Sequence, residues 1–339
     1  MENTTIKINK VDVSIIIVNY KSWNHLKNCL NSIKNLNNLS FTFETIVVDN
    51  HSNDGNFKSF TTEFKQVAFF ENSGNNGFAN GCNLGYEKAN GDYFLFLNPD
   101  TIVNAAALEE IFHVSAKNSS IGISSCLQKN SLGSYEKTFN FYPKLTTLFG
   151  LSRAIFSFFK NKKSILNNKM IYTDWVSGSL IFISRNWFEK VNGWNEDYWM
   201  YFEDVDLCKK IHQLNGKVII LSSVEIIHAH GGASRINFKT STITKNEVQI
   251  SKHVYIQNHL KGFERFMSHF LLISHNIFTK SVLAILGVLF FFIPKMRLNV
   301  YLFFKIMKYY FSRLKTGTWL SINSVNFKNI QNEARNKEK

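Results

Sequence analysis

Cysteine and proline are both scarce in this 339-residue chain, which has four of the former and three of the latter. The cysteines lie far apart and none forms a Cys-x-x-Cys pair, so a disulfide framework and a thiolate zinc site are disfavoured. We expect these thiols to be reduced and mostly buried. With 45% hydrophobic and 19% charged residues, the composition is that of a globular protein.

Two further absences concern the N-terminus and acidic residues. The first residues, MENTTIKINKVDVS, lack the apolar core of a signal peptide, so we expect folding to begin in the cytoplasm. The 25 Asp and Glu residues are outnumbered by 39 Lys and Arg, which gives a net charge of +14. No carboxylate side chain lies between Arg265 and Asn332. This balance predicts an anionic partner, either nucleic acid, anionic lipid or a phosphorylated substrate.

Apolar runs alternate with helix-like stretches over the first two hundred or so residues. The apolar runs predict strands over residues 13–18, 45–48, 67–70 and 93–97, and the spacing of Leu26, Leu30 and Ile33 predicts a helix over residues 23–33. Such alternation indicates an α/β fold with right-handed crossovers and a mainly parallel sheet flanked by helices. We expect a catalytic domain over residues 1–235 and a helical, basic C-terminal region over residues 236–339.

Polar residues follow three of the predicted strands: Asn19-Tyr20, Asp49-Asn50 and Asn98-Pro99-Asp100. Ligands of such sheets bind beyond the carboxyl ends of the strands. Asp100 is therefore either a turn or helix-capping residue, or an oxygen ligand for Mg²⁺ or Mn²⁺. Asp49 is either a turn residue or an acceptor for the imide N–H of a pyrimidine base.

A loop rich in glycine and asparagine spans residues 71–91 and leads into a short helix. Its sequence is neither G-x-G-x-x-G after the first strand nor a P-loop, which disfavours a dinucleotide enzyme and a P-loop ATPase. Glycine-rich turns before helix N-termini cradle phosphates. We therefore expect a substrate contact from four residues of this loop: Asn76, Gly77, Asn80 and Asn83.

The segment over residues 193–217 combines an acidic pair with aromatic residues. Glu203 and Asp204 open a predicted helix that ends at Asn215-Gly216. Negative charge at a helix start is favoured by the helix dipole alone. The other interpretation is a general base at a helix entrance, with aromatic residues such as Trp194 and Tyr201 packing against a sugar ring.

Two histidines, His228 and His230, follow a predicted strand over residues 224–227. A structural role is the simpler interpretation, and a second ligand for a metal or phosphate is the alternative. Alternate residues of a strand point to opposite faces, so we expect only one of the two to take part.

Together these segments resemble the inverting family 2 glycosyltransferases of GT-A fold, and most closely their rhamnosyltransferase-like branch. The similar stretches are SIIIVNYKSWNHLKNCLNSI, VVDNHSNDG, NNGFANGCNLG, LNPDT and YFEDVDLCKKI, within residues 11–235. The resemblance places Asp49 and the chain from Val18 through Asn19 to Tyr20 at the nucleotide. It makes Asp204, beside Glu203, the catalytic base. Asn98-Pro99-Asp100 takes the place of the metal-binding D-x-D motif, with Asn98 in place of the first Asp.

The resemblance further implies a direct displacement that inverts the anomeric carbon, with a Mg²⁺ or Mn²⁺ ion on the leaving nucleoside diphosphate. It makes dTDP-rhamnose the expected donor, and a UDP-hexose or UDP-galactofuranose the alternative. The expected acceptor is a glycan or a lipid-linked sugar in cell-surface polysaccharide synthesis. Nucleic-acid binding is the remote alternative, and we expect none because no base-stacking motif accompanies the basic residues.

The C-terminal region mixes aliphatic and aromatic residues with Lys and Arg. Its longest uncharged apolar run, residues 281–293, has 13 residues, fewer than the ~20 that a bilayer span needs. We expect interfacial helices on an anionic leaflet, and hence a cytoplasmic protein peripheral to the inner face of the plasma membrane. An ordinary helical subdomain packed on the catalytic core is the alternative. No feature of the sequence indicates an oligomeric state.

Overall fold

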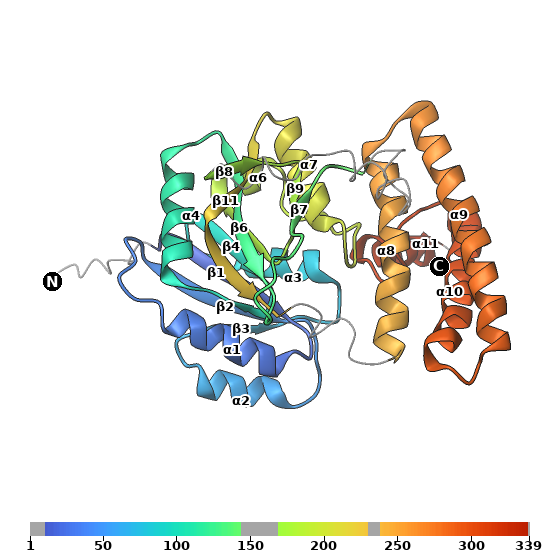
Figure 1. Ribbon diagram of the computed structural model, residues 1–339, viewed down its shortest axis with the longest axis horizontal. Helices are drawn as coiled ribbons and strands as arrows, with labels where there is room; N and C mark the ends of the chain where they lie inside the picture. Colours follow the sequence, from blue (N-terminus) through green and yellow to red (C-terminus); the bar gives the residue numbers. More distant parts are fainter. Residues whose placement is uncertain (1–10, 144–168, 230–237, 338–339) are drawn as a thin grey trace.

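A central nine-stranded sheet organises the N-terminal part of the computed structural model, which describes residues 11–143, 169–229 and 238–337 (Figure 1). The strand order is β3-β2-β1-β4-β10-β6-β11-β5, with β8 also paired to β11. The strands of this sheet are β1 (Val13–Asn19), β2 (Phe43–Asp49), β3 (Ala68–Glu71), β4 (Tyr93–Leu97), β5 (Thr101–Ile102), β6 (Ile121–Lys129), β8 (Met170–Tyr172), β10 (Leu180–Ser184) and β11 (Lys217–His228). A separate pair joins β7 (Phe139–Asn140) to β9 (Trp175–Val176).

The sheet is mainly parallel, as expected. Strands β3, β2, β1 and β4 pair in parallel with their neighbours. Strand β10 is antiparallel to both β4 and β6, so β6 and its parallel partner β11 run in the same direction as β4. Only β5, β8 and β10 run the other way among the described strands of this sheet. The four strands predicted over residues 13–97 are present, each within two residues of its expected bounds.

Strand β1 is buried at every position because helices cover both faces of the sheet. Alternate residues point to opposite faces: Ile15 and Ile17 join one core cluster, and Ile16 and Val18 join the other. The first face is covered by α1 (Trp23–Lys34), α2 (Asn56–Glu63) and α4 (Ala105–Lys117), and the second by α3 (Phe78–Glu87), α6 (Arg185–Lys190) and α7 (Glu203–Gln213). The four cysteines are free and buried, as predicted.

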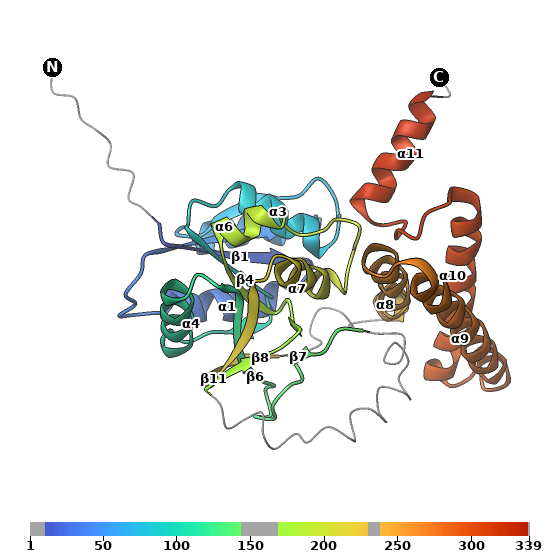
Figure 2. The same ribbon diagram turned by 90° about the horizontal axis from the view of Figure 1, so that it is seen from above.

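Four helices form the C-terminal region beside the sheet (Figures 1 and 2): α8 (Phe238–His259), α9 (Gly262–Leu289), α10 (Pro294–Thr316) and α11 (Val325–Lys337). They share a core with the sheet-bearing part, in which Tyr198 and Val205 pack with Tyr255 and Ile306. The apolar run over residues 281–293 does not form one element. Helix α9 ends at Leu289, and a turn leads to Pro294 at the first position of α10.

The polarity of α9 is inverted relative to a helix that packs an apolar face inward. Apart from Leu272, its buried residues are small or polar: Ser268, His269, Asn276, Ala284 and Gly287. Its outer side exposes large apolar residues, including Phe266, Phe270, Phe278, Ile285, Val288 and Leu289. Among the described helices, α9 alone has the length and apolar composition to cross a membrane, and 17% of its most apolar window is buried. A single helix of this kind is weak evidence for a span.

Candidate active site

The carboxyl ends of β1 and β2 lie side by side, as predicted, with Asn19 paired to Asp49. Asp49 is fully buried and accepts hydrogen bonds from Asn19 Nδ2 (2.8 Å) and from both the backbone N and Oγ of Ser52 (2.8 and 2.6 Å). This burial does not fit the expected direct contact between Asp49 and a nucleotide base. Asp49 instead holds the two strand ends together, a role closer to the turn-forming alternative.

Tyr20 is the accessible residue at the end of β1. It is 40% exposed, whereas Val18 and Asn19 before it are buried. Val18 packs against α3 so closely that a Cβ atom added to Gly81 would lie 2.7 Å from Val18 Cγ1. Of the predicted nucleotide residues on β1, Tyr20 therefore has the surface that a ligand can reach.

Asp100 lies beside His228, which joins the ends of β4 and β11. His228 Nε2 is 3.3 Å from Asp100 Oδ1, and His228 Nδ1 is 3.1 Å from Glu136 Oε2. Burial lowers the pKa of His228, but the hydrogen bonds and charges of Asp100 and Glu136 outweigh it and raise the pKa overall. The capping alternative for Asp100 is wrong, because Asn104 caps α4 by accepting from Ala107 N.

The spacing of Asp100 and His228 fits two ligands of one divalent cation. In an octahedral site with ligands at about 2.1 Å, neighbouring ligand atoms lie about 3.0 Å apart. The observed 3.3 Å is close to this value. Glu136 faces the other ring nitrogen, the position from which a carboxylate orients a metal-bound histidine. The described residues hold no cluster of three or more His, Cys, Asp or Glu side chains suited to a metal, and His230 lies outside them.

The asparagine-rich loop binds protein groups instead of facing an open cradle. Asn80 Nδ2 donates to Glu196 Oε2 (3.0 Å), and Asn83 Nδ2 donates to Glu196 Oε1 (2.8 Å). Asn83 Oδ1 also accepts from the backbone N of Trp194, and Asn76 Oδ1 accepts from Lys328 Nζ. Asn80 and Asn83 thus have protein partners, and their contact with a nucleotide sugar stays a prediction. Asn80 and Asn83 therefore hold the 194–202 loop in place, whereas Asn76 contacts α11.

Gly77 is required by the same loop. It precedes α3 with φ of 96°, and a Cβ atom there would lie 2.2 Å from the carbonyl oxygen of Trp199. That oxygen accepts the first N–H of α3, from Phe78 (3.0 Å). The predicted phosphate cradle is thus closed at this helix start by Trp199. Only glycine allows the two backbones to come so close.

Asp204 is half-buried near the start of α7, with its carboxylate held by two backbone donors. Its Oδ2 accepts from Gly178 N (3.0 Å), and its Oδ1 accepts from Val205 N (2.8 Å). The next residue along from Gly178, Ser179, accepts from Asn98 N, which ties Asp204 to the end of β4. Burial raises the pKa of Asp204 above that of an ordinary aspartate, although the two N–H groups oppose the shift.

Glu203 differs from Asp204 although the two are adjacent. It is 7% exposed, and its Oε2 atom has no hydrogen-bond partner in the described part of the chain. Burial and the neighbouring Asp204 raise the pKa of Glu203 well above its usual range. Because Glu203 is enclosed, Asp204 is the carboxylate of the pair that a substrate can reach.

Two residues with positive φ precede this acidic pair. Tyr201 and Phe202 have φ of 71° and 68°, and Phe202 is the residue before the first turn of α7. Left-handed backbone at a non-glycine residue costs about 1–3 kcal/mol and persists only where the surroundings impose it. Such strain concentrates at functional sites, and here it sets the entry angle of α7.

The two predicted acceptor-binding aromatics have different environments. Trp194 is 2% exposed and packs edge-on against Phe78 and Phe96, so stacking of a sugar on Trp194 does not fit the structure. Tyr201 is half-buried and lies two residues before Glu203. Tyr201 therefore remains the acceptor candidate of the pair.

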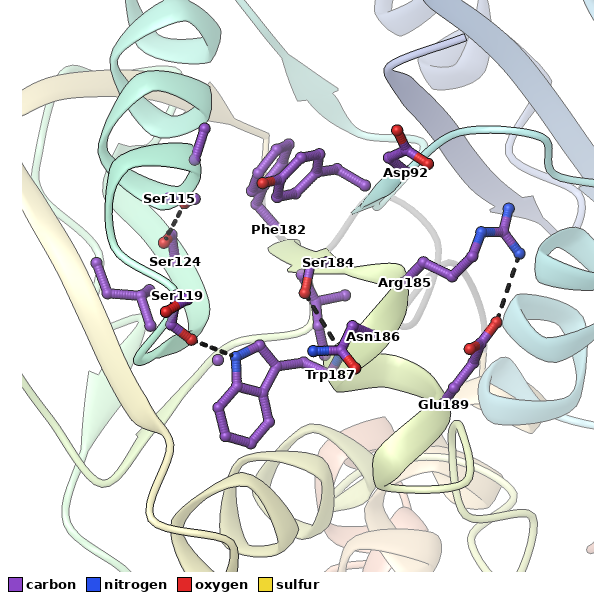
Figure 3. Close-up of a pocket in the computed structure, with 15 residues that line it drawn as sticks. Asp92, Ser115, Ser119, Ser124, Phe182, Ser184, Arg185, Asn186, Trp187 and Glu189 are labelled. Carbon is purple, nitrogen blue, oxygen red and sulfur yellow. Dashed lines mark hydrogen bonds and ion pairs between the residues drawn. The ribbon is translucent and has the colours of Figure 1, made fainter. Parts of the chain in front are cut away.

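A pocket of about 480 Å³ lies at the opposite end of the sheet (Figure 3). Its lining includes Tyr93 and Ile121, which begin β4 and β6, and Ser184, which ends the antiparallel β10. Its most prominent cation, Arg185, already donates to the carbonyl groups of Ala89 and Gly91 and pairs with Glu189. This pocket is at the amino ends of the parallel strands and holds none of the predicted site residues.

Three residues of the site went unpredicted: Glu136, Gly178 and Glu196. Each acts on a partner between 26 and 116 residues away in the sequence. The short stretch Ser177-Gly178-Ser179 before an apolar run was an available signal for a turn at a strand start, but not for its contact with Asp204.

Two similar proteins are named as sugar transferases. The low-salt glycan biosynthesis hexosyltransferase Agl10 of Haloferax volcanii is 27% identical over 285 residues, covering 80% of this chain and 78% of that protein. Rhamnosyltransferase WbbL of Escherichia coli K12 is 25% identical over 229 residues, covering 64% and 83%. These relatives agree with the resemblance to the rhamnosyltransferase-like branch.

The fold is also that of known glycosyltransferases. The mannosyltransferase PcManGT of Pyrobaculum calidifontis, solved with GDP-Man and Mn²⁺, superposes with a TM-score of 0.53 at 14% identity, covering 88% of each chain. The expected GT-A architecture is thus confirmed. A family model described as the N-terminal domain of galactosyltransferase matches residues 162–231. The model of glycosyl transferase family 2 matches residues 14–191, more than half of the chain, and the chain therefore belongs to glycosyl transferase family 2.

Proposed function

We propose that this glycosyltransferase moves L-rhamnose from dTDP-L-rhamnose to a hydroxyl of a glycan or lipid-linked acceptor, with inversion at the anomeric carbon. The environment of the Asp204 carboxylate is the main support for this proposal. This carboxylate is reachable, oriented by Gly178 N and Val205 N, and raised in pKa by burial. It lies at the same sheet edge as the Asp100–His228 pair, to which Asn98 and Ser179 connect it.

Asp204 acts as the general base. As the acceptor oxygen attacks the anomeric carbon, Asp204 takes the proton of that hydroxyl. A base is most effective when its pKa lies near the working pH, and burial moves Asp204 in that direction. A single displacement from the face opposite the leaving group gives the inverted product. Glu203 is enclosed and its pKa is raised by burial and by Asp204, so it is the less suitable base of the two.

Asp100 and His228 would hold the divalent cation. The 3.3 Å between their ligand atoms supports this assignment, and Glu136 would orient the imidazole. A bound Mg²⁺ or Mn²⁺ supplies Lewis-acid stabilisation to the leaving diphosphate. Donor phosphates and water would supply the remaining ligands of the ion. The Mn²⁺ of the Pyrobaculum mannosyltransferase structure agrees with this class of ion.

The donor assignment rests on similarity. WbbL bears the name rhamnosyltransferase, which supports rhamnose. The partial match to the galactosyltransferase model favours the second candidate donor, a UDP-hexose or UDP-galactofuranose. The transfer mechanism would be the same for either donor. In either case Tyr20 and Asn98 are among the nucleotide-side residues with accessible surface, and Tyr201 is the acceptor-side aromatic.

The enzyme is proposed to act at an anionic membrane surface, on its cytoplasmic side. Helix α9 exposes its phenylalanines to solvent, and α10 exposes Lys295, Lys305, Lys308 and Lys315 in a segment without carboxylates. Apolar residues that enter the lipid boundary beside lysines that meet anionic headgroups are typical of interfacial helices. Attachment of this kind brings a lipid-linked acceptor within reach of the sheet edge.

Calorimetric titration with dTDP, UDP, GDP and ADP, with and without Mn²⁺, tests donor and cation together. We expect dTDP to bind most tightly, to bind more tightly with Mn²⁺, and to lose that gain in the Asp100→Ala variant. A preference for UDP would move the assignment to the second donor class. Failure of all four nucleotides to bind would contradict a nucleotide-sugar site at this edge.

A further inference from the structure

We infer that the C-terminal helices belong to the catalytic apparatus, and that Asp197 is the positioning residue through which they hold the 194–202 loop. The inference rests on the proposed function only for the role of Asp204, which follows this loop. The evidence is a set of contacts that reach the loop from two opposite parts of the chain.

One side of the loop is held by α3 and the residues before it. Glu196 accepts from Asn80 and Asn83. The backbone of Trp199 accepts from Phe78 N, and Trp199 Nε1 donates to Asn75 O (3.1 Å). These contacts belong to the sheet-bearing part.

The other side is held by two separate C-terminal helices. Asp197 Oδ2 accepts from Asn258 Nδ2 of α8 (3.0 Å), and Asp197 Oδ1 accepts from Asn326 Nδ2 of α11 (2.8 Å). Ser251 Oγ of α8 donates to Met200 O (2.8 Å). Both carboxylate oxygens of Asp197 are therefore used by C-terminal residues.

The same helices reach past the loop to α7. His259 Nε2, at the end of α8, lies 2.7 Å from Asp206 Oδ1, two residues after Asp204. Tyr255 packs with Tyr198 of the loop and Val205 of α7. Figure 2 shows α7 beside α8, at the border between the two parts of the molecule.

The loop ends in a turn that needs such support. Tyr201 and Phe202 carry positive φ values immediately before Glu203. Without the contacts to Asp197 and Met200, the loop would keep its α3 side and two longer hydrogen bonds to Asp206, from Asn195 (3.4 Å) and Tyr198 (3.3 Å). The turn after Met200 would then be free to relax. Asp204 would then leave the position set by Gly178. The C-terminal helices thus fix the base as well as the contact with a membrane.

Hydrogen–deuterium exchange on the full chain tests this directly. We expect peptides covering residues 194–206 to exchange at least about tenfold faster in Asp197→Ala and in the double variant Asn258→Ala/Asn326→Ala. Peptides of β1 and β4 should keep their wild-type protection. The matched control is Gln257→Ala/Asn329→Ala, which removes exposed side chains one residue before Asn258 and three after Asn326. Wild-type exchange of the loop in Asp197→Ala would overturn the inference.

Measuring kcat together with nucleotide affinity distinguishes a positioning role of Asp197 from a role in folding alone. With the donor found by titration, kcat should fall at least about tenfold in Asp197→Ala while the Kd for the nucleoside diphosphate stays unchanged. Asp197→Asn should retain most activity, because the new side chain can keep both hydrogen bonds. The amide oxygen at position 197 still accepts from Asn258, and the NH₂ group there can donate to Asn326 once the Asn326 amide has rotated. A loosened loop with unchanged kcat would overturn the catalytic part. If no nucleotide sugar is turned over, the proposed function fails, and the exchange result still decides whether Asp197 holds the loop.

Discussion

At the scale of single residues, the structure separates two adjacent acids by their surroundings. Asp204 is reachable and held by two N–H groups, whereas Glu203 is enclosed and has an oxygen without a hydrogen-bond partner in the described chain. Substituting Asp204 by Asn removes the proposed base and keeps the shape of the side chain. We expect kcat to fall about 10²–10⁴-fold with little change in nucleotide affinity. Equal losses in kcat and in nucleotide binding would point to a folding defect instead.

The pH dependence of turnover follows from the same burial. Asp204 must be ionised to accept a proton, and its pKa is raised. Activity should therefore fall as the pH decreases through a value above ~3.9, the pKa of an exposed aspartate. A pH profile of kcat at saturating donor measures this acid limb. Full activity persisting down to pH 4 would contradict the assignment of Asp204 as the base.

At the scale of elements, the start of α3 depends on one glycine. We expect Gly77→Ala to destabilise the protein by about 2–4 kcal/mol, because it adds a clash with Trp199 O to the cost of positive φ. Gly55 is the matched control: it precedes α2 with φ of 82°, and a Cβ atom there would meet nothing within 4 Å. Gly55→Ala should cost only about 1–2 kcal/mol. Chemical denaturation compares the two, and equal losses would show that the contact with Trp199 is unimportant.

Helix α8 carries a buried acid, Glu247, which is 2% exposed. Burial raises its pKa to about 7, although hydrogen bonds from Ser321 and Asn323 oppose the shift. Because this folded-state pKa exceeds the unfolded value, the contribution of Glu247 to stability is fully present below about pH 4.5 and is lost as the pH rises through 7. The loss amounts to about 3 kcal/mol. Chemical denaturation measures the free energy of unfolding at pH 5 and at pH 8. The decrease between the two pH values should be smaller for Glu247→Gln than for the wild type, and an equal decrease would contradict this account.

At the scale of the whole molecule, α9 exposes large apolar side chains and α10, which packs against it, exposes lysines. Co-sedimentation with phosphatidylglycerol vesicles should capture the wild-type protein and lose it as salt rises. Replacing Phe266, Phe270 and Phe278 by Ser should weaken capture at least about tenfold without changing nucleotide binding. Capture by neutral and anionic vesicles alike would contradict the role of the lysines. Binding to DNA of similar salt dependence, with no vesicle binding, would revive the nucleic-acid alternative.

How much of this could be read from the sequence differs between backbone and side chains. The strand ends at Asn19, Asp49 and Asp100 follow apolar runs, so their meeting at one sheet edge was predictable. The hydrogen bonds of Asp49, Asn80 and Asn83 could not be predicted in this way. Each of these side chains binds a protein partner that the sequence pattern does not reveal. Trp194 shows the same limit, since an aromatic residue that suits a sugar also suits a core.

The contact of Asn326 with Asp197 has a consequence for the order in which the protein becomes active. The described strands of the sheet are all translated before residue 230, and so are Asp100, Asp204 and His228. One anchor of the 194–202 loop, Asn326, comes almost a hundred residues later. A nascent chain that has folded its sheet is therefore still incomplete. Synthesis itself delays activity until α11 emerges and docks, by which time the apolar face of α9 is also complete.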